Sequence, residues 1–165
     1  MLWKEKIRKV KKIRRSSKIK DNFLKTMVKT FDMQLIRYIN LFGRITGVSA
    51  KHCFLYNNMI VFIVDSFAIE RSLGRDNSNL KKISNIVNKR VRVLAEPSSK
   101  KDIEKFISVL VSPIQYQNLE VKDDEVIITA GMESKAMLIG RGRVREQELK
   151  AILEQYFRIK NLKII

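Results

Sequence analysis

Met137-Leu138-Ile139-Gly140-Arg141-Gly142-Arg143-Val144 is the stretch from which the fold of this 165-residue chain is best predicted. An apolar segment runs into a Gly-Arg-Gly-Arg corner, and an amphipathic pattern begins directly after it. Glycine permits a positive φ and lets a ligand approach the backbone closely. The first turn of a following helix leaves N–H groups unpaired, and these favour an anion. The stretch therefore predicts a tight corner between two helices that is suited to holding a phosphate.

A similar stretch lies sixty-six residues earlier in the chain. Ser72-Leu73-Gly74-Arg75-Asp76-Asn77-Ser78-Asn79-Leu80 again joins an apolar segment to an amphipathic one through a Gly-Arg corner, and Ser78 is predicted to cap the second helix. The predicted hairpin turns at Asn57 and Asp123 have the same offset of sixty-six residues. A repeat that includes both the hairpin turn and the corner is a stronger signal than either motif alone.

The order helix, strand, strand, helix, corner, helix, strand is predicted twice. In the first copy we expect a helix from Asp32 to about 43–47, strands at 50–56 and 59–64, helices at 67–73 and from 78, and a strand at 90–94. In the second copy we expect a helix that stops before Pro113, strands at 115–121 and 126–129, helices at 135–139 and 144–157, and a strand at 162–165. The uninterrupted apolar segment 59–64 suits a strand covered on both faces, or one shielded by helices on one face. Each copy predicts a three-stranded sheet with helices on one face, which is an α+β fold.

Charge and composition divide the chain into three segments. The Pro-Ser break at 96–99 predicts a boundary between a first domain, 32–96, and a second domain, 97–165. Residues 1–31 hold 12 Lys and Arg against 2 acidic residues and form a basic N-terminal arm. The arm is predicted to be either mobile or a helix that folds against RNA, a ribosome or a polymerase; a helix on a membrane surface is the less favoured alternative.

The overall composition indicates a soluble, intracellular, nucleic-acid-binding protein. The net charge of +17 favours polyanionic partners, with nucleic acid ahead of an anionic membrane. A single cysteine excludes an intramolecular disulfide framework and fits a reducing cytoplasm. No apolar run approaches the roughly 18–20 residues that cross a bilayer, and no secretory signal is evident.

We expect neither an enzyme nor a cofactor or metal site. His52 and Cys53 are adjacent on a predicted strand and so face opposite sides, and no second pair of metal ligands is present. The only histidine would have to serve as the base for any nucleophile. The Asp123-Asp124-Glu125 cluster is explained by a solvated hairpin turn, and Glu146, Glu148 and Glu154 by solvated helix positions. No Gly-Lys-Ser/Thr motif follows a strand, and a small-molecule substrate is not expected.

The two copies with their glycine corners resemble tandem type II KH domains. The segments Ile36-Arg37-Tyr38-Ile39-Asn40-Leu41-Phe42, Ser78-Asn79-Leu80-Lys81-Lys82-Ile83 and Leu138-Ile139-Gly140-Arg141-Gly142 resemble those of the short archaeal NusA-like transcription factors, over about residues 32–165. The resemblance implies that each corner clamps the backbone of single-stranded RNA while the bases lie between a helix and a sheet edge, about four nucleotides per domain. It also implies a cytoplasmic role in termination, pausing or antitermination with RNA polymerase as partner.

The predicted RNA contacts cluster at the two corners: Gly74, Arg75, Asp76, Asn77, Ser78, Lys81, Lys82, Gly140, Arg141, Gly142, Arg143 and Arg145. The family pattern ends each corner in glycine, whereas here the last positions are Asn77 and Arg143. Asn tolerates the left-handed region, but the Asp76 carboxylate would repel a phosphate. These departures favour the second corner over the first as an RNA contact. They also leave an alternative: a ribosome-associated or structural RNA-binding protein with degenerate corners, anchored by its basic arm.

Overall fold

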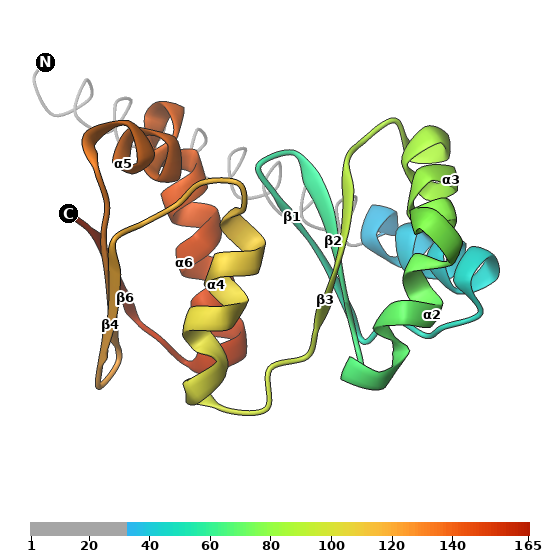
Figure 1. The fold of residues 1–165 in the computed structure, drawn as a ribbon, viewed down its shortest axis with the longest axis horizontal. Helices are drawn as coiled ribbons and strands as arrows, with labels where there is room; N and C mark the ends of the chain where they lie inside the picture. Colours follow the sequence, from blue (N-terminus) through green and yellow to red (C-terminus); the bar gives the residue numbers. More distant parts are fainter. Residues whose placement is uncertain (1–32) are drawn as a thin grey trace, which may run out of the picture. The chain divides into compact units, whose positions relative to one another are not determined.

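The computed structural model describes residues 33–165, and the basic arm and Asp32 lie outside the described residues. Residues 39–165 form one compact unit; the other unit, residues 1–38, is described only from residue 33 on. A helix covers residues 33–46, close to its predicted span. Within 39–165 the fold is α+β, with two three-stranded sheets and their helices (Figure 1).

The first repeat, residues 39–95, contains one of the two sheets, sheet A. Its strands are β1 (His52–Tyr56), β2 (Met59–Val64) and β3 (Val91–Ala95) in that order, with β1 antiparallel and β3 parallel to β2. A short helical turn, η1 (Ser66–Ala68), leads into α2 (Ile69–Leu73), the first corner leads through η2 (Arg75–Asn77) into α3 (Ser78–Val87), and α3 leads into β3. The predicted hairpin and both helices are confirmed.

The second repeat, residues 103–164, has the same order of elements. η3 (Lys100–Asp102) leads into α4 (Ile103–Val111), followed by β4 (Asn118–Lys122) and β5 (Glu125–Thr129). α5 (Met132–Ile139), η4 (Arg141–Arg143), α6 (Val144–Phe157) and β6 (Asn161–Ile164) complete it. Sheet B has the order β4-β5-β6, again with one antiparallel and one parallel pair. α5 begins three residues earlier than predicted, and α6 has the predicted span.

The central strand of sheet A, β2, is covered on both faces. On one face Phe62 of β2 stacks on Phe42 of helix 33–46, with ring centroids 4.3 Å apart. On the other face Val61 and Ile63 belong to a buried cluster that includes side chains from α4 and α6 of the second repeat. In Figure 1, α4 and α6 lie between the two sheets. The structure therefore selects the two-sided alternative for segment 59–64, and every residue of β2 is buried.

The outer face of sheet B differs from the matching face of sheet A. The residues equivalent to Val61 and Ile63 by the offset of sixty-six are Ile127 and Thr129, and both are partly exposed. β4 is almost entirely exposed, and Lys163 of β6 pairs with Glu125 of β5 on this face. The first repeat thus carries the second on an apolar sheet face, whereas the second repeat turns a polar face to solvent.

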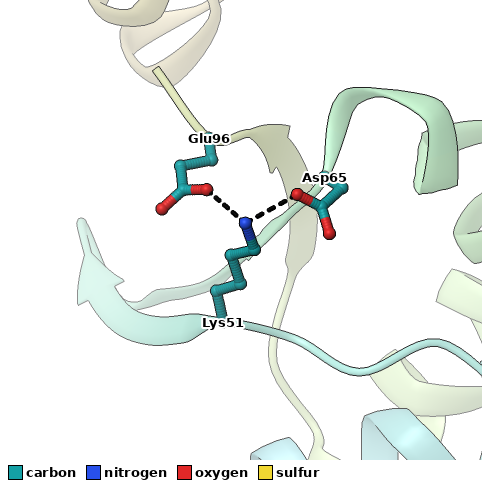
Figure 2. A network of polar contacts seen from close by, with 3 residues as sticks. All are labelled: Lys51, Asp65 and Glu96. Atoms are coloured by element: carbon teal, nitrogen blue, oxygen red, sulfur yellow. Dashed lines mark hydrogen bonds and ion pairs between the residues drawn. The ribbon is translucent and has the colours of Figure 1, made fainter. Parts of the chain in front are cut away.

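One ion-pair network links residues that flank the three strands of sheet A, close to the point where the chain continues into the second repeat. Lys51 Nζ, just before β1, lies 2.6 Å from Asp65 Oδ1 and 2.5 Å from Glu96 Oε2, which follow β2 and β3 (Figure 2). These hydrogen bonds raise the pKa of Lys51 to about 12, and the bond to Asp65 has the larger effect. The side chains remain near 40% exposed, so we expect the network to add little to stability.

Candidate nucleic-acid interface

The two corners, residues 74–77 and 140–143, follow the same backbone path. Gly74 has φ 71° and ψ 177°, and Gly140 has φ 72° and ψ 170°, a conformation open essentially only to glycine. The third and fourth positions of both corners are left-handed: Asp76, Asn77, Gly142 and Arg143. The first corner therefore holds two side chains, and the second corner one, in a region that L-residues occupy at a cost of about 1 kcal/mol each.

Hydrogen bonding repeats with the backbone path. Gly74 N–H donates to Glu70 O at 3.1 Å, and Gly140 N–H donates to Ala136 O at 2.9 Å. These pairs match at the sixty-six-residue offset that the sequence predicts. The internal repeat is thus present in the hydrogen bonds as well as in the order of elements.

A side chain crosses each corner and fixes its first glycine. Asn79 Nδ2 donates to Arg71 O at 3.3 Å, and the equivalent Arg145 Nη1 donates to Met137 O at 2.8 Å. A Cβ on Gly74 would lie 2.8 Å from Asn79 Nδ2, and a Cβ on Gly140 would lie 2.8 Å from Arg145 Cγ. Arg145, predicted as an RNA contact, therefore has a structural role at the corner.

The helix after the first corner begins differently from the prediction. Ser78 was expected to be the N-cap, but it has helical angles (φ −60°, ψ −36°) and is the first residue of α3. The N-cap is Asn77, whose side chain makes no capping hydrogen bond. The expectation was wrong because the left-handed turn at the fourth corner position already brings the chain into the helix one residue earlier.

An open groove of about 510 Å³ starts at the first corner and runs between α3 and the edge strand β3. Apolar side chains form part of its lining: Met59, Leu73, Leu80, Val91 and Val93. Polar and basic side chains form the rest: Asn77, Lys81, Ser84, Asn85, Arg90 and Arg92. Apolar side chains with donors and acceptors beside them suit an unstacked base, whose faces are apolar and whose edges form hydrogen bonds.

Of the basic residues predicted at the first corner, only one lines the groove. Lys81 does so, whereas the adjacent Lys82 does not, because neighbouring helix residues point about a quarter turn apart. Arg75 and Asp76 are exposed, and neither makes an ion pair with another residue in the described part of the chain. The first corner thus offers one guanidinium and one carboxylate to solvent.

At the second corner the Arg143 guanidinium is already bound by a carboxylate of the same chain. Arg143 Nε and Nη2 donate to the two carboxylate oxygens of Glu146 at 2.7 and 2.9 Å, and these hydrogen bonds raise the pKa of Arg143. Glu146 is 9% exposed, so the expectation of a solvated helix position was wrong. Within residues 33–165, Arg141 is exposed and makes no ion pair. A phosphate at this corner would meet Arg141 first and would compete with Glu146 for Arg143.

Arg92 lines the groove but is bound to the second repeat. Its guanidinium donates to Val109 O, to Leu110 O at 3.1 Å and to Ser112 O at 3.2 Å, at the C-terminal end of α4. Burial lowers the pKa of Arg92. A cation at a helix C-terminus satisfies the last carbonyls. Arg92 therefore connects the edge strand of the groove, β3, to the end of α4 in the second repeat.

Several groove residues were not predicted from the sequence. Leu80, Ser84 and Asn85 line it together with Asn77 and Lys81, at the three- and four-residue spacing of one helix face. That spacing is visible in the sequence and, together with the corner, indicates which face of α3 a ligand would meet. Arg90 was assigned to the predicted strand, and no local pattern places it in a groove.

The described residues contain no group of three His, Cys, Asp or Glu side chains arranged to hold a metal ion. Within the same part of the chain, every helix is too short or too polar to cross a bilayer.

Comparisons with known proteins give a distant sequence relationship and a shared fold. No family model matches the chain. A protein from Halococcus morrhuae described as probable transcription termination protein NusA is 20% identical over 132 residues, which cover 78% of this chain and 93% of that protein. A solved structure, described as the crystal structure of APE1850, is similar with a TM-score of 0.56 and 24% identity, covering 81% of this chain and 99% of that one. The structural similarity supports the α+β fold.

Proposed function

We propose that this chain is a NusA-like, single-stranded RNA-binding protein built from two type II KH domains, residues 32–96 and 97–165. The distant similarity to a protein named for transcription termination supports the link to transcription. The repeated helix–corner–helix backbone supports the KH assignment. The net charge of +17 supports a nucleic-acid partner.

The observation that carries the proposal is the open groove at the first corner. In the proposed complex the RNA backbone passes over residues 74–77, where the exposed Arg75 guanidinium binds a phosphate. Bases enter the groove against Leu80 and Val91, and the Asn85 amide bonds their edges. Asp76 weakens the phosphate contact, so base contacts carry more of the affinity here than at a corner without a carboxylate.

This assignment reverses the preference for the second corner derived from the sequence. The second corner presents Arg141 but holds Arg143 against Glu146. We propose that the first domain supplies the principal site and that the second contributes a weaker contact at Arg141 and Gly142.

We further propose that the protein acts without enzymatic activity in the cytoplasm of an archaeon, on nascent transcripts and with RNA polymerase as its protein partner. A second candidate is a ribosome-associated protein in which the basic arm supplies the RNA affinity. Asp76 and the Arg143–Glu146 pair favour that candidate, since both reduce phosphate binding at the corners. Removing residues 1–31 separates the two: only the NusA-like protein keeps a preference for single strands over duplex.

Lys81→Glu, with Lys82→Glu as its matched control, tests the groove. Both lysines lie on α3 and both changes reverse the same charge, but only Lys81 lines the groove. Titration of a short, labelled single-stranded RNA should show a loss of at least tenfold for Lys81→Glu and a much smaller loss for Lys82→Glu, with equal melting temperatures. Equal losses would mean that the RNA responds to net charge alone, and the groove would be excluded.

A further inference from the structure

The hairpin turn between β1 and β2 lies between the groove of the first repeat and the second corner. Asn57 and Asn58 form this turn, both in the left-handed region, with φ 50° and 56°. On one side Arg90 Nη2 donates to Asn57 O at 3.4 Å, and Lys89 Nζ donates to Asn58 Oδ1. Arg90 also lines the groove, so the groove ends at the turn.

On its other side the turn contacts the helix that follows the second corner. Asn57 N–H donates to Glu148 Oε2 at 2.8 Å, and Glu148 lies one turn of α6 after Val144, where that helix begins. Arg145, whose side chain crosses the second corner and donates to Met137 O, lies three residues before Glu148 in the same helix. Hydrogen bonds therefore connect the groove residue Arg90 to the turn and the turn to α6, the helix that begins at the second corner.

The side chains along this path are mostly cationic. Lys89 and Arg90 lie at the turn, and Arg141 lies exposed at the second corner. The carboxylates of Glu148 and Glu146 are already bound, to the backbone of the turn and to Arg143 respectively. Lys89 and Arg90 make no ion pair with a carboxylate in the described part of the chain. They bond only neutral oxygens, so their charges remain available to an anion.

We infer that the Asn57–Asn58 turn with Lys89 and Arg90 is a third phosphate-binding site, which joins the two corners into one track for a single RNA strand. The inference rests on the proposed function. A strand that fills the groove leaves it at Arg90, places a phosphodiester at Lys89 and Arg90, and continues to Arg141. The turn supplies the amide side chains of Asn57 and Asn58, which bond sugar or phosphate oxygens without selecting a base.

The test compares a four-nucleotide RNA, which fills one groove, with a twelve-nucleotide RNA of the same leading sequence. Lys89→Ala removes a charge at the turn but not from the groove lining. Lys101→Ala is the matched control, because Lys101 is an exposed lysine on η3 without an ion pair in the described residues.

We expect the wild-type protein to bind the longer RNA more tightly. Lys89→Ala should reduce that gain several-fold, leave the short RNA unaffected, and lower the salt slope for the long RNA by about 0.7, the value for one phosphate contact on a single strand. Lys101→Ala should change the affinity for neither RNA. An RNA carrying a photoreactive base at successive positions should crosslink to the groove, then to 57–58 or 89–90, then to 140–143.

Two other results have separate meanings. If the longer RNA gains affinity but Lys89→Ala and Lys101→Ala behave alike, and no crosslink reaches 57–58 or 89–90, the track is wrong while the groove stands. If neither RNA binds, or if a duplex of the twelve-nucleotide sequence binds better than either single strand, the proposed function itself fails.

Discussion

At the scale of single residues, Glu146 decides what the second corner can bind. Its carboxylate holds the Arg143 guanidinium by two short hydrogen bonds, in the geometry with which arginine binds a phosphate. The first repeat has Leu80 at the equivalent position, and Leu80 lines an open groove. Two changes of residue type between the repeats, from Asn77 to Arg143 and from Leu80 to Glu146, therefore accompany the difference between an open groove and an arginine held by the protein's own carboxylate.

Glu146→Gln should increase the affinity for single-stranded RNA several-fold, because it frees the Arg143 guanidinium and removes a carboxylate from the corner. Glu154→Gln is the control: it makes the same charge change at an exposed position of the same helix. Affinities measured by fluorescence anisotropy at constant salt would separate the two. An equal gain in both variants would show that only net charge matters.

The Tyr56 hydroxyl is buried and has no hydrogen-bond partner among the described residues. Because an unpaired buried hydroxyl costs about 1–3 kcal/mol, Tyr56→Phe should leave the free energy of unfolding at pH 7 unchanged or raise it by about 1 kcal/mol. Burial raises the pKa of this phenol from 10.0 to about 12. The unfolded chain therefore loses its proton first, and stability falls as the pH rises through this range.

Urea unfolding of wild type and Tyr56→Phe at pH 9 and pH 11 measures both effects. The variant should show a shallower loss of stability toward pH 11, since one raised phenol is gone while Cys53 and Lys51, whose pKa values are also raised to about 12, remain. A variant that is markedly less stable than wild type at pH 7 would show that the hydroxyl has a partner.

At the scale of elements, each corner depends on its first glycine more than on any later position. Gly74 has φ 71° and ψ 177°, and a Cβ there would meet Asn79 at 2.8 Å. Gly142 has φ 62° and ψ 21°, and a Cβ there would meet nothing within 4 Å. The two positions therefore differ in both backbone conformation and space.

Gly74→Ala should lower the free energy of unfolding by about 1–3 kcal/mol, the usual cost of a side chain in such a backbone conformation. Gly142→Ala should cost only about 1 kcal/mol, since it places alanine in an ordinary left-handed turn. Thermal and urea unfolding of both variants would measure the difference. If Gly142→Ala were the more damaging of the two, the first glycine would not be the position on which the corner depends.

The elements themselves were largely predictable from the sequence. Apolar periodicity placed both hairpins and most helices, and the sixty-six-residue repeat placed both corners, because these are properties of neighbouring residues. The role of Glu146 was not predictable in this way, since a glutamate in a first helical turn is ordinary. The true start of α3 was also not predictable. Asn77, the fourth corner residue, takes the left-handed conformation despite carrying a side chain, so Ser78 is already helical. The spacing of the groove residues on α3 is visible in the sequence, but the sequence does not show that β3 forms the opposite wall of the groove.

At the scale of the whole molecule, the contact between the repeats depends on one face of sheet A. Val61 is completely buried there among residues that include side chains of α4 and α6. Ile127 has the same register position in sheet B but lies on the outer, partly exposed face. The sequence alone did not say which of these equivalent strands would be covered, because that depends on how the repeats pack.

Val61→Lys and Ile127→Lys form a matched pair that tests this difference. Val61→Lys should destabilise the protein by more than about 3 kcal/mol, since it places a charge without a partner in the shared core. Ile127→Lys should cost less than about 1 kcal/mol, because the lysine reaches solvent. Circular dichroism during urea unfolding gives both values, and similar losses in the two variants would contradict the packing of the second repeat on sheet A.

The contrast between these matching faces of the two sheets also decides which of them another repeat could pack on. A third copy would find mostly hydrophilic side chains on sheet B where docking needs aliphatic ones, so it could not pack there as the second repeat packs on sheet A. Exchanging the order of the copies would bare the aliphatic sheet to water and force the hydrophilic one against α4 and α6. The duplicated modules are therefore not interchangeable, because only the first offers an aliphatic sheet face on which the other can pack.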